Sequence, residues 1–375
     1  MRQTLHNIGT PDHVALAYDA WGLVGNDGRV PDEQRATWLA DLARISVAPD
    51  YKHSYERWKT SFSAMGDRLA ELTLASRLLI GHGNSSAIDV GITVHHTWGV
   101  PVIPGAALKG LVAHYVDATY GSTDPDRKPW EQQGDERARA DYQGVTWNRR
   151  RIERGPGAIY RALFGAPDAR EDDAMREHGF EAGASTGLVT FHDALYVPDS
   201  IADNKPFAAD VLTVHQKGYY DSAGKSAPND YDSPNPVAFI TVRPKCRLLL
   251  VLSGPRDWTE LAGQLLHDAL ETWGVGSKTS AGYGIGVVGP WRQPDVQASK
   301  ILAEFETWLA DATRVTVPQR QRLAEIIEHR LPKLLSLSPD ERQRAAKGIR
   351  KVIKSPKLAA DRDKLIAQLI KEQDP

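Results

Sequence analysis

The sequence predicts an α+β fold in which a strand, a helix, a group of strands, a second helix and a last strand follow one another. Two observations predict this order. Segments that alternate polar and apolar residues, as half-buried strands do, are interleaved with segments whose apolar residues recur at helical spacing. Glycine- and proline-rich stretches separate these segments. With 375 residues, 41% hydrophobic and 25% charged, the chain has room for one large domain or two moderate ones.

The N-terminal part is predicted to be helical over residues 1–67, after an irregular start. One apolar face is made by four residues at helical spacing: Trp38, Leu39, Leu42 and Ile45. Residues 71–78 then alternate between polar and apolar and predict the first strand of the main domain, which residues 81–84 end with a Gly-His-Gly-Asn turn.

The first helix of the main domain is predicted to start near Gly105, because five apolar residues follow at helical spacing: Leu108, Leu111, Val112, Tyr115 and Val116. Residues 119–185 are rich in glycine and charge, and we interpret them as a surface insertion with one buried helical piece at 159–165. Residues 187–194 predict the next strand, with His192 and Asp193 at its turn.

The second half of the main domain begins with a proline-rich stretch. Five prolines lie in residues 197–236, which excludes long helices and predicts a projecting loop or hairpin. Residues 237–242 and 246–252 predict two strands joined at Pro244. A helix follows, with Asp257 and Glu260 spaced as in a capping box, and ends at Gly274.

A last strand, residues 285–288, and a helical tail complete the prediction. Four prolines divide the tail into about four short helices: Pro318, Pro332, Pro339 and Pro356. The order of elements is the βαββαβ arrangement of ferredoxin-like, RRM-like domains, with insertions. We therefore predict a main domain over residues 68–290 and a C-terminal helical extension over 291–375.

Composition narrows the cellular setting. The single cysteine, Cys246, excludes a disulfide framework and any cysteine-based metal cage. No apolar run approaches the roughly 20 residues that span a bilayer, and the polar residues 1–12 lack the apolar core of a signal peptide. We expect a cytoplasmic protein that does not contact a membrane.

Charge is unevenly distributed. The net charge of −2 counts against a nucleic-acid binder, but residues 291–375 hold 17 Lys and Arg against 12 Asp and Glu. Such segregation indicates either a basic contact surface or exposed helices whose Lys and Arg residues serve only solubility.

The strongest local motif is a glycine-rich bend over residues 274–284, in which four glycines accompany Lys278, Thr279 and Ser280. Glycines permit close backbone approach, and the three polar residues offer donors that suit a phosphate. A helix precedes the bend and a strand follows it, the reverse of a nucleotide-hydrolysing P-loop. The bend is therefore either a phosphate contact or a tight helix-to-strand connection.

Two segments resemble signatures of the RAMP superfamily. Residues 102–110, Val-Ile-Pro-Gly-Ala-Ala-Leu-Lys-Gly, are similar to its PxIPGSSLKG segment, and residues 274–284 are similar to its C-terminal glycine-rich loop. Three more stretches resemble the sixth-numbered subunits of the CRISPR type III-B Cmr effector complex: residues 96–101, 214–220 and 233–239. The resemblance covers about residues 68–290. Ala106 and Ala107 stand where the family has two serines, so their hydroxyls are missing.

The resemblance implies a non-catalytic, structural RNA-binding subunit in antiviral RNA-guided interference. Its partners would be the 3′ part of the guide RNA, the target RNA and neighbouring Cmr/RAMP subunits, and it implies no cofactor or metal. Such binding needs cations for phosphates and aromatic rings for bases. Nine residues of the matching segments are the candidates: Lys109, His215, Lys217, Tyr219, Tyr220, Lys278, Thr279, Ser280 and Tyr283. For Tyr219 and Tyr220, a local apolar cluster beneath a loop is the competing interpretation.

Signals for an enzyme are weak. His95 and His96 are adjacent, so on a strand they would point to opposite faces, and no HExxH or CxxC spacing occurs. Asp89 occupies the place where ribonucleolytic members of the superfamily carry an aspartate, although an Asp that serves a loop turn through its own side chain is the favoured interpretation. The alternative function is therefore a ribonuclease, which would cleave target RNA through Asp89 or process guides alone. A third reading is a docking module whose helical tail binds protein.

Overall fold

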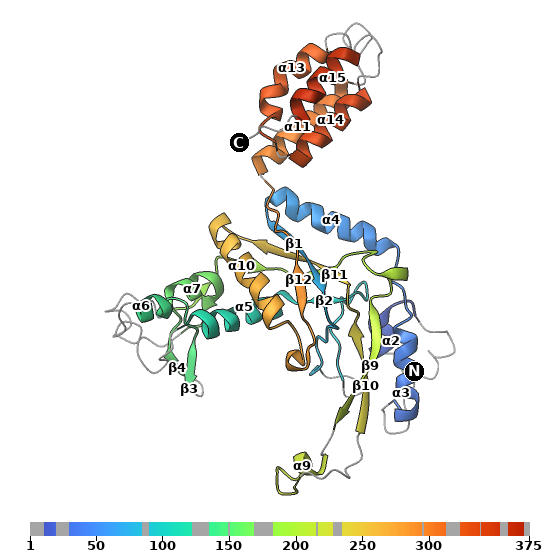
Figure 1. Ribbon diagram of the computed structural model, residues 1–375, viewed down its shortest axis with the longest axis vertical. Helices are drawn as coiled ribbons and strands as arrows, with labels where there is room; N and C mark the ends of the chain where they lie inside the picture. Colours follow the sequence, from blue (N-terminus) through green and yellow to red (C-terminus); the bar gives the residue numbers. More distant parts are fainter. Residues whose placement is uncertain are drawn as a thin grey trace. The chain divides into compact units, whose positions relative to one another are not determined.

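The computed structural model describes residues 11–19, 30–84, 90–121, 135–148, 151–168, 183–214, 217–227, 235–294, 296–312, 323–337, 339–352 and 359–370. The chain divides into two compact units. Residues 1–60 and 68–292 form the first unit, and residues 61–67 and 293–375 form the second. Helices and strands are mixed in the first unit, so the fold is α+β (Figure 1).

The first unit is built on an antiparallel sheet. Its strands lie in the order β12 (Gly286–Val288), β1 (Arg68–Leu74), β11 (Arg247–Ser253), β8 (Ala194–Tyr196) and β2 (Val102–Ile103), and β7 (Thr190–Phe191) also pairs with β11. The register between the two central strands runs from Arg68 opposite Leu252 to Thr73 opposite Arg247. Leu248 to Leu252 are all buried, as expected for a strand covered on both faces.

Helices cover the two faces of this sheet. Ala70, Leu72 and Leu74 face one side, on which α5 (Gly105–Tyr120) and α10 (Arg256–Thr272) pack. On the other side Arg247 donates to Glu71 across 2.7 Å, next to Tyr55 of α4 (Asp50–Met65). The Tyr51 hydroxyl of the same helix donates to the Tyr196 carbonyl at 2.5 Å.

A long hairpin stands beside the sheet (Figure 1). Strands β9 (Phe207–Val214) and β10 (Asn235–Val242) pair over eight residues each, and α3 (Asp32–Leu42) packs against both. A bridge between Leu78 and Val242 ties the hairpin to the chain after β1. The short helix α9 (Lys217–Asp221) lies at its tip. Residues 197–236 therefore contain a full strand, as the hairpin alternative requires.

Smaller elements complete the first unit. Helix α2 (Val14–Asp19) precedes α3. The insertion contains α6 (Asp135–Ala140), the pair β3 (Thr146–Asn148) and β4 (Arg151–Arg154), α7 (Ala158–Phe164), and the pair β5 (Gly165–Ala166) and β6 (Ser185–Thr186). The predicted buried helical piece is α7, whose Leu163 and Phe164 are buried.

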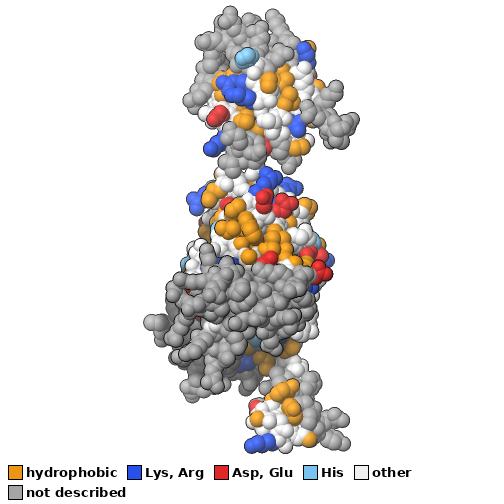
Figure 2. Space-filling view, turned by 90° about the vertical axis from the view of Figure 1, so that its left-hand side faces the viewer, with side chains coloured by type: hydrophobic (Ala, Val, Ile, Leu, Met, Phe, Trp, Pro, Cys, Tyr) orange, Lys and Arg blue, Asp and Glu red, His pale blue; other side chains and the backbone are white. Residues whose placement is uncertain are grey.

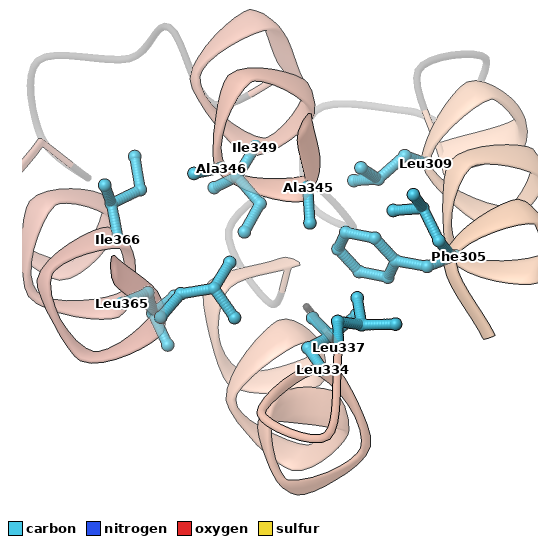
Figure 3. Close-up of a cluster of buried hydrophobic side chains, with 11 residues drawn as sticks. Phe305, Leu309, Leu334, Leu337, Ala345, Ala346, Ile349, Leu365 and Ile366 are labelled. Atoms are coloured by element: carbon cyan, nitrogen blue, oxygen red, sulfur yellow. The ribbon is translucent and has the colours of Figure 1, made fainter. Parts of the chain in front are cut away.

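The second unit is a set of helices around its own core. Four helices are described in its C-terminal part: α11 (Val296–Ala312), α13 (Leu323–Leu334), α14 (Pro339–Val352) and α15 (Ala359–Ile370). Figure 3 shows their buried side chains pointing toward one another, with Phe305 from α11 opposite Ala345 of α14 and Leu334 of α13. An ion pair of 3.1 Å joins Arg344 to Glu306 at the surface.

Several local predictions are wrong. Strand β1 ends at Leu74 rather than continuing to residue 78. Asp257 does not cap α10, because Pro255 is the N-cap residue and makes no side-chain cap. Pro332 does not break a helix but lies inside the last turns of α13.

No helix among the described residues is both long and apolar enough to cross a bilayer.

Candidate nucleic-acid interface

Left-handed backbone shapes the glycine-rich bend. Gly274, Gly276, Gly282 and Gly284 have φ between 73° and 93°, and Lys278 has φ of 60°. A side chain at Gly284 would overlap the carbonyl of Val275, whereas one at Gly282 would meet nothing within 4 Å. Left-handed backbone therefore favours glycine at both positions, and lack of space requires it only at Gly284.

Backbone hydrogen bonds fix the bend to the segment that follows β1. Ser277 N donates to the Leu79 carbonyl at 2.7 Å, and Gly284 N donates to the Arg77 carbonyl at 2.8 Å. Ile285 N donates to Ser76 Oγ at 3.0 Å. These bonds fix the base of the bend, residues 277 and 284–285, to the end of the sheet, while the outer residues 278–282 lie away from it.

Those outer residues include the predicted phosphate contacts. Lys278 and Ser280 are exposed and Thr279 is half-buried, and a short 3₁₀ turn over Thr279–Ala281 follows Lys278 directly. An exposed cation beside two hydroxyls on an open bend can approach a phosphate without rearrangement.

Tyr283 also joins the bend to the hairpin. Its hydroxyl donates to Asp210 Oδ2 at 2.9 Å, and the same oxygen lies 3.2 Å from Arg77 Nη1. Its ring packs near Phe239 with a centroid distance of 6.3 Å. Burial and the bond to Asp210 raise the pKa of Tyr283. The predicted contact of Tyr283 with RNA stays a prediction, and the structure adds this tethering role.

His82 lies near Lys278 of the bend and was not predicted as a site residue from the sequence. Burial lowers the pKa of His82, and the nearby ammonium of Lys278 lowers it further. Its ring lies edge-on to Phe239 with a centroid distance of 6.0 Å. A lone histidine in a Gly-His-Gly-Asn turn carries no signal of this proximity, because the bend that approaches it lies about 200 residues later in the chain.

The remaining candidates lie on two other elements. Lys109 is half-buried, one turn inside the start of α5. Tyr219 and Tyr220 lie in α9, with side chains 37% and 70% exposed and ring centroids 5.4 Å apart. Figure 2 shows hydrophobic side chains at the surface of this hairpin tip. The exposure of Tyr220 argues against a buried apolar cluster. His215 and the side chain of Lys217 lie outside the described residues.

The start of α5 explains the segment over residues 102–110. Gly105 N donates to Asp193 Oδ1 at 2.7 Å, so a carboxylate from the β7–β8 connection takes the role that a serine hydroxyl would take. A side chain at Gly105 would overlap the carbonyl of Phe191. Ala106 and Ala107 therefore leave the helix start capped, and Asp193 is the capping residue that the sequence did not reveal.

The expectation that the side chains of His95 and His96 point to opposite faces of a strand is wrong. Trp98 N and Gly99 N both donate to the His95 carbonyl, at 3.2 and 2.7 Å, so a turn replaces the expected strand. The two imidazoles consequently lie stacked, 5.4 Å apart at 12°, instead of on opposite faces. In the described part of the chain, no three His, Cys, Asp or Glu side chains form a group that could hold a metal ion. Asp89 lies outside that part.

Comparison with known proteins gives consistent matches. Residues 71–287 match the model of the RAMP superfamily. The CRISPR system Cmr subunit Cmr6 of Pyrococcus furiosus is 31% identical over 245 residues, which cover 62% of this chain and 72% of that protein.

Two solved structures are also similar. The crystal structure of Cmr6 from Pyrococcus furiosus has a TM-score of 0.33 at 27% identity and covers 59% of this chain and 97% of that one. A chain of the cryo-EM structure of the type III-B Cmr-beta bound to cognate target RNA has a TM-score of 0.46 at 16% identity, covering 79% of this chain and 90% of that one. Since the family model spans more than half of its residues, the chain belongs to the RAMP superfamily.

Proposed function

We propose that the chain is a structural RNA-binding subunit of a CRISPR type III-B Cmr effector complex, in the position that the Cmr6 subunit holds. Membership of the RAMP superfamily and 31% identity to a Cmr6 subunit support this function. Its partners are then the guide RNA, whose 3′ part it holds, the target RNA and neighbouring Cmr subunits. The cytoplasmic location expected from composition accords with such partners.

The sheet supports the ferredoxin-like part of this proposal. Strands β12, β1, β11 and β8 lie side by side and pair only in antiparallel fashion. In chain order they are the fourth, first, third and second strands, with α5 after the first and α10 after the third. That is the order a ferredoxin-like βαββαβ domain has. We retain residues 68–290 as this domain, 1–67 as the N-terminal segment and 291–375 as the C-terminal extension.

One observation carries the RNA-binding proposal: Lys278 is exposed on a bend whose base is fixed. Because the backbone around it is held by bonds to residues 76–79, the point from which the side chain projects is fixed, and the backbone loses little conformational freedom on binding. Thr279 and Ser280 follow it directly. RNA recognition by shape needs this kind of positioned cation and hydroxyls against phosphates.

The test compares two lysines that share an unusual backbone. Lys278 and Lys245 are both exposed, and both have positive φ, of 60° and 68°. Asparagine tolerates this conformation, so Lys278→Asn and Lys245→Asn remove the same charge at equal conformational cost. We expect Lys278→Asn to weaken guide RNA binding by the reconstituted complex and to lower the salt slope of log K by about one.

The control fixes the interpretation. Lys245→Asn leaves the affinity and the salt slope near those of the wild type, because Lys245 lies in the β10–β11 turn and not on the bend. Equal effects of the two substitutions would show a general charge effect and would contradict a phosphate contact at the bend.

A further inference from the structure

An open pocket of about 350 Å³ lies on the α4 side of the sheet. Six residues line it: Trp58, His95, Phe191, His192, Asp193 and Leu195. They come from α4, from the turn after residue 94 and from the β7–β8 segment, all within the first unit. The glycine-rich bend contributes none of these lining residues, so the pocket is distinct from the interface described above.

The walls of the pocket are flat rings. Trp58 continues the stripe of α4 that Tyr51 and Tyr55 begin, at positions i, i+4 and i+7, and it is half-buried. Across from this helix, His95 is stacked on His96. Phe191 and Leu195 are each 8% exposed and add apolar surface. Such walls suit a planar aromatic guest, since bases stack on Trp and His side chains.

The polar groups of the pocket are held in place. Asp193 Oδ1 accepts the Gly105 N–H at 2.7 Å, which fixes the orientation of an exposed carboxylate. His192 Nε2 lies 2.7 Å from Ser253 Oγ, which fixes the imidazole plane. Burial, and then His96, lowers the pKa of His95, so this ring is neutral near pH 7 and able to stack or accept.

Charge decides which part of a nucleotide fits. None of the six lining residues is Lys or Arg, and the Asp193 carboxylate would repel a phosphate. The same carboxylate accepts hydrogen bonds from an exocyclic amino group, as Asp and Glu do from cytosine N4. Uracil has carbonyl oxygens where cytosine and adenine carry that amino group, so it would bind less well.

We propose that this pocket binds a single unstacked RNA base that carries an exocyclic amino group, with Trp58 as the stacking surface and Asp193 as the acceptor. The inference rests on the proposed RNA-binding function and adds a second, base-directed site to it. The bend grips backbone phosphate, whereas the pocket holds a base.

The first test measures binding of oligo(A), oligo(C) and oligo(U) of equal length to the full-length chain by fluorescence anisotropy. Wild type binds oligo(A) and oligo(C) more tightly than oligo(U). Trp58→Ala weakens oligo(A) binding at least about fivefold, because stacking is worth roughly 1–3 kcal/mol per base, while Trp58→Phe retains most of it. Thr60→Ala, an exposed position on the same helix, leaves it unchanged.

The second test changes one atom of the acceptor. Asp193→Asn keeps an oxygen for the Gly105 N–H and replaces the other oxygen by an amino group. We expect the preference for oligo(A) and oligo(C) over oligo(U) to shrink, while circular dichroism and the melting temperature stay close to wild type. Unchanged preference in a folded Asp193→Asn variant would overturn the role of the carboxylate.

Three further outcomes would overturn the pocket. In the first, Trp58→Ala and Thr60→Ala bind oligonucleotides equally well. In the second, the wild-type chain binds no oligonucleotide. In the third, Trp58→Ala binds RNA normally but no longer co-purifies with partner subunits, which would assign the pocket to a protein segment. The proposed function is judged separately by Lys278→Asn in the complex. A null pocket result with a weakened Lys278→Asn complex therefore rejects the pocket alone.

Discussion

The glycine-rich bend makes a quantitative prediction, because two of its glycines share a left-handed backbone but differ in the space around them. Gly282 has φ of 87° and open space where a side chain would stand. Gly282→Ala therefore costs only the strain of left-handed backbone, about 1–2 kcal/mol. Gly284 has φ of 75°, but a Cβ there would overlap the Val275 carbonyl and lie 3.0 Å from Val275 N.

The added cost at Gly284 comes from the contact that must open. Val275 N donates to the Gly284 carbonyl at 3.0 Å, and moving these two parts of the bend apart forfeits about 0.5–1.5 kcal/mol for that bond. Gly284→Ala should then cost about 1.5–3.5 kcal/mol from the strain and the lost bond together, with the overlap adding to this. We expect Gly284→Ala to lose RNA binding with stability, and Gly282→Ala to retain most of both.

Urea unfolding at pH 7.5, followed by tryptophan fluorescence, measures both costs on the full-length chain. Gly282→Asn is the control, since asparagine tolerates left-handed backbone better than alanine does, and it should lie between wild type and Gly282→Ala. If the two alanine variants lose equal free energy of unfolding, the proposed close contact between Gly284 and Val275 is refuted. The proposal that the base of the bend is fixed is then refuted as well.

Three other predictions follow from the structure. Phe305→Ala removes a ring that is 2% exposed and should cost the helical unit about 3–5 kcal/mol, whereas Leu335→Ala at 36% exposure should cost far less. Amide hydrogen exchange should become faster in residues 293–375 alone. Equally faster exchange in residues 68–292 would contradict the division into two units. Because the folded pKa of His82 lies below the unfolded value of about 6.5, its contribution to the free energy of unfolding is present above pH 6.5 and is lost as pH falls through the folded pKa. The difference between wild type and His82→Asn, taken from urea unfolding between pH 7.5 and 5, should therefore narrow with acid, and a constant difference would refute it. Asp89→Ala in a reconstituted complex should leave target RNA cleavage unchanged at every site, and loss of one cleavage site would favour the ribonuclease alternative.

The order of elements was predictable because it depends on local patterns. The apolar stripe from Leu261 onward predicts α10, and the apolar segments 237–242 and 246–252 predict β10 and β11 within two residues of their observed bounds. The end of β1 was not predictable, since Leu78 continues the apolar pattern but pairs with Val242 of the hairpin instead of the sheet. Which strand receives a residue depends on tertiary contacts that a local pattern does not contain.

Residues of the candidate site could be proposed from the sequence only where one segment carries them. Lys278, Thr279 and Ser280 are consecutive, so the bend could be identified from its own composition. His82 and Asp193 act through partners far away in the chain, Lys278 in one case and Gly105 in the other. The place of Pro332 could not be predicted from its residue type, because a proline removes an i→i−4 hydrogen bond and usually ends a helix, yet α13 continues past it to Leu334.

Side-chain contacts join the hairpin to the bend. Asp210 holds Tyr283 of the bend at 2.9 Å and Arg77 at 3.2 Å, so the middle of β9 is tied to the base of the bend. Four more residues of β9 at about 3.3 Å each carry the chain roughly 13 Å further toward its tip, where Tyr220 is exposed. With Lys278 on the bend and the tyrosines in α9 beyond β9, we propose that this surface contacts more than one nucleotide. The contribution of this surface to affinity should therefore depend on the length of RNA bound more than on its sequence, unlike that of the base-directed pocket.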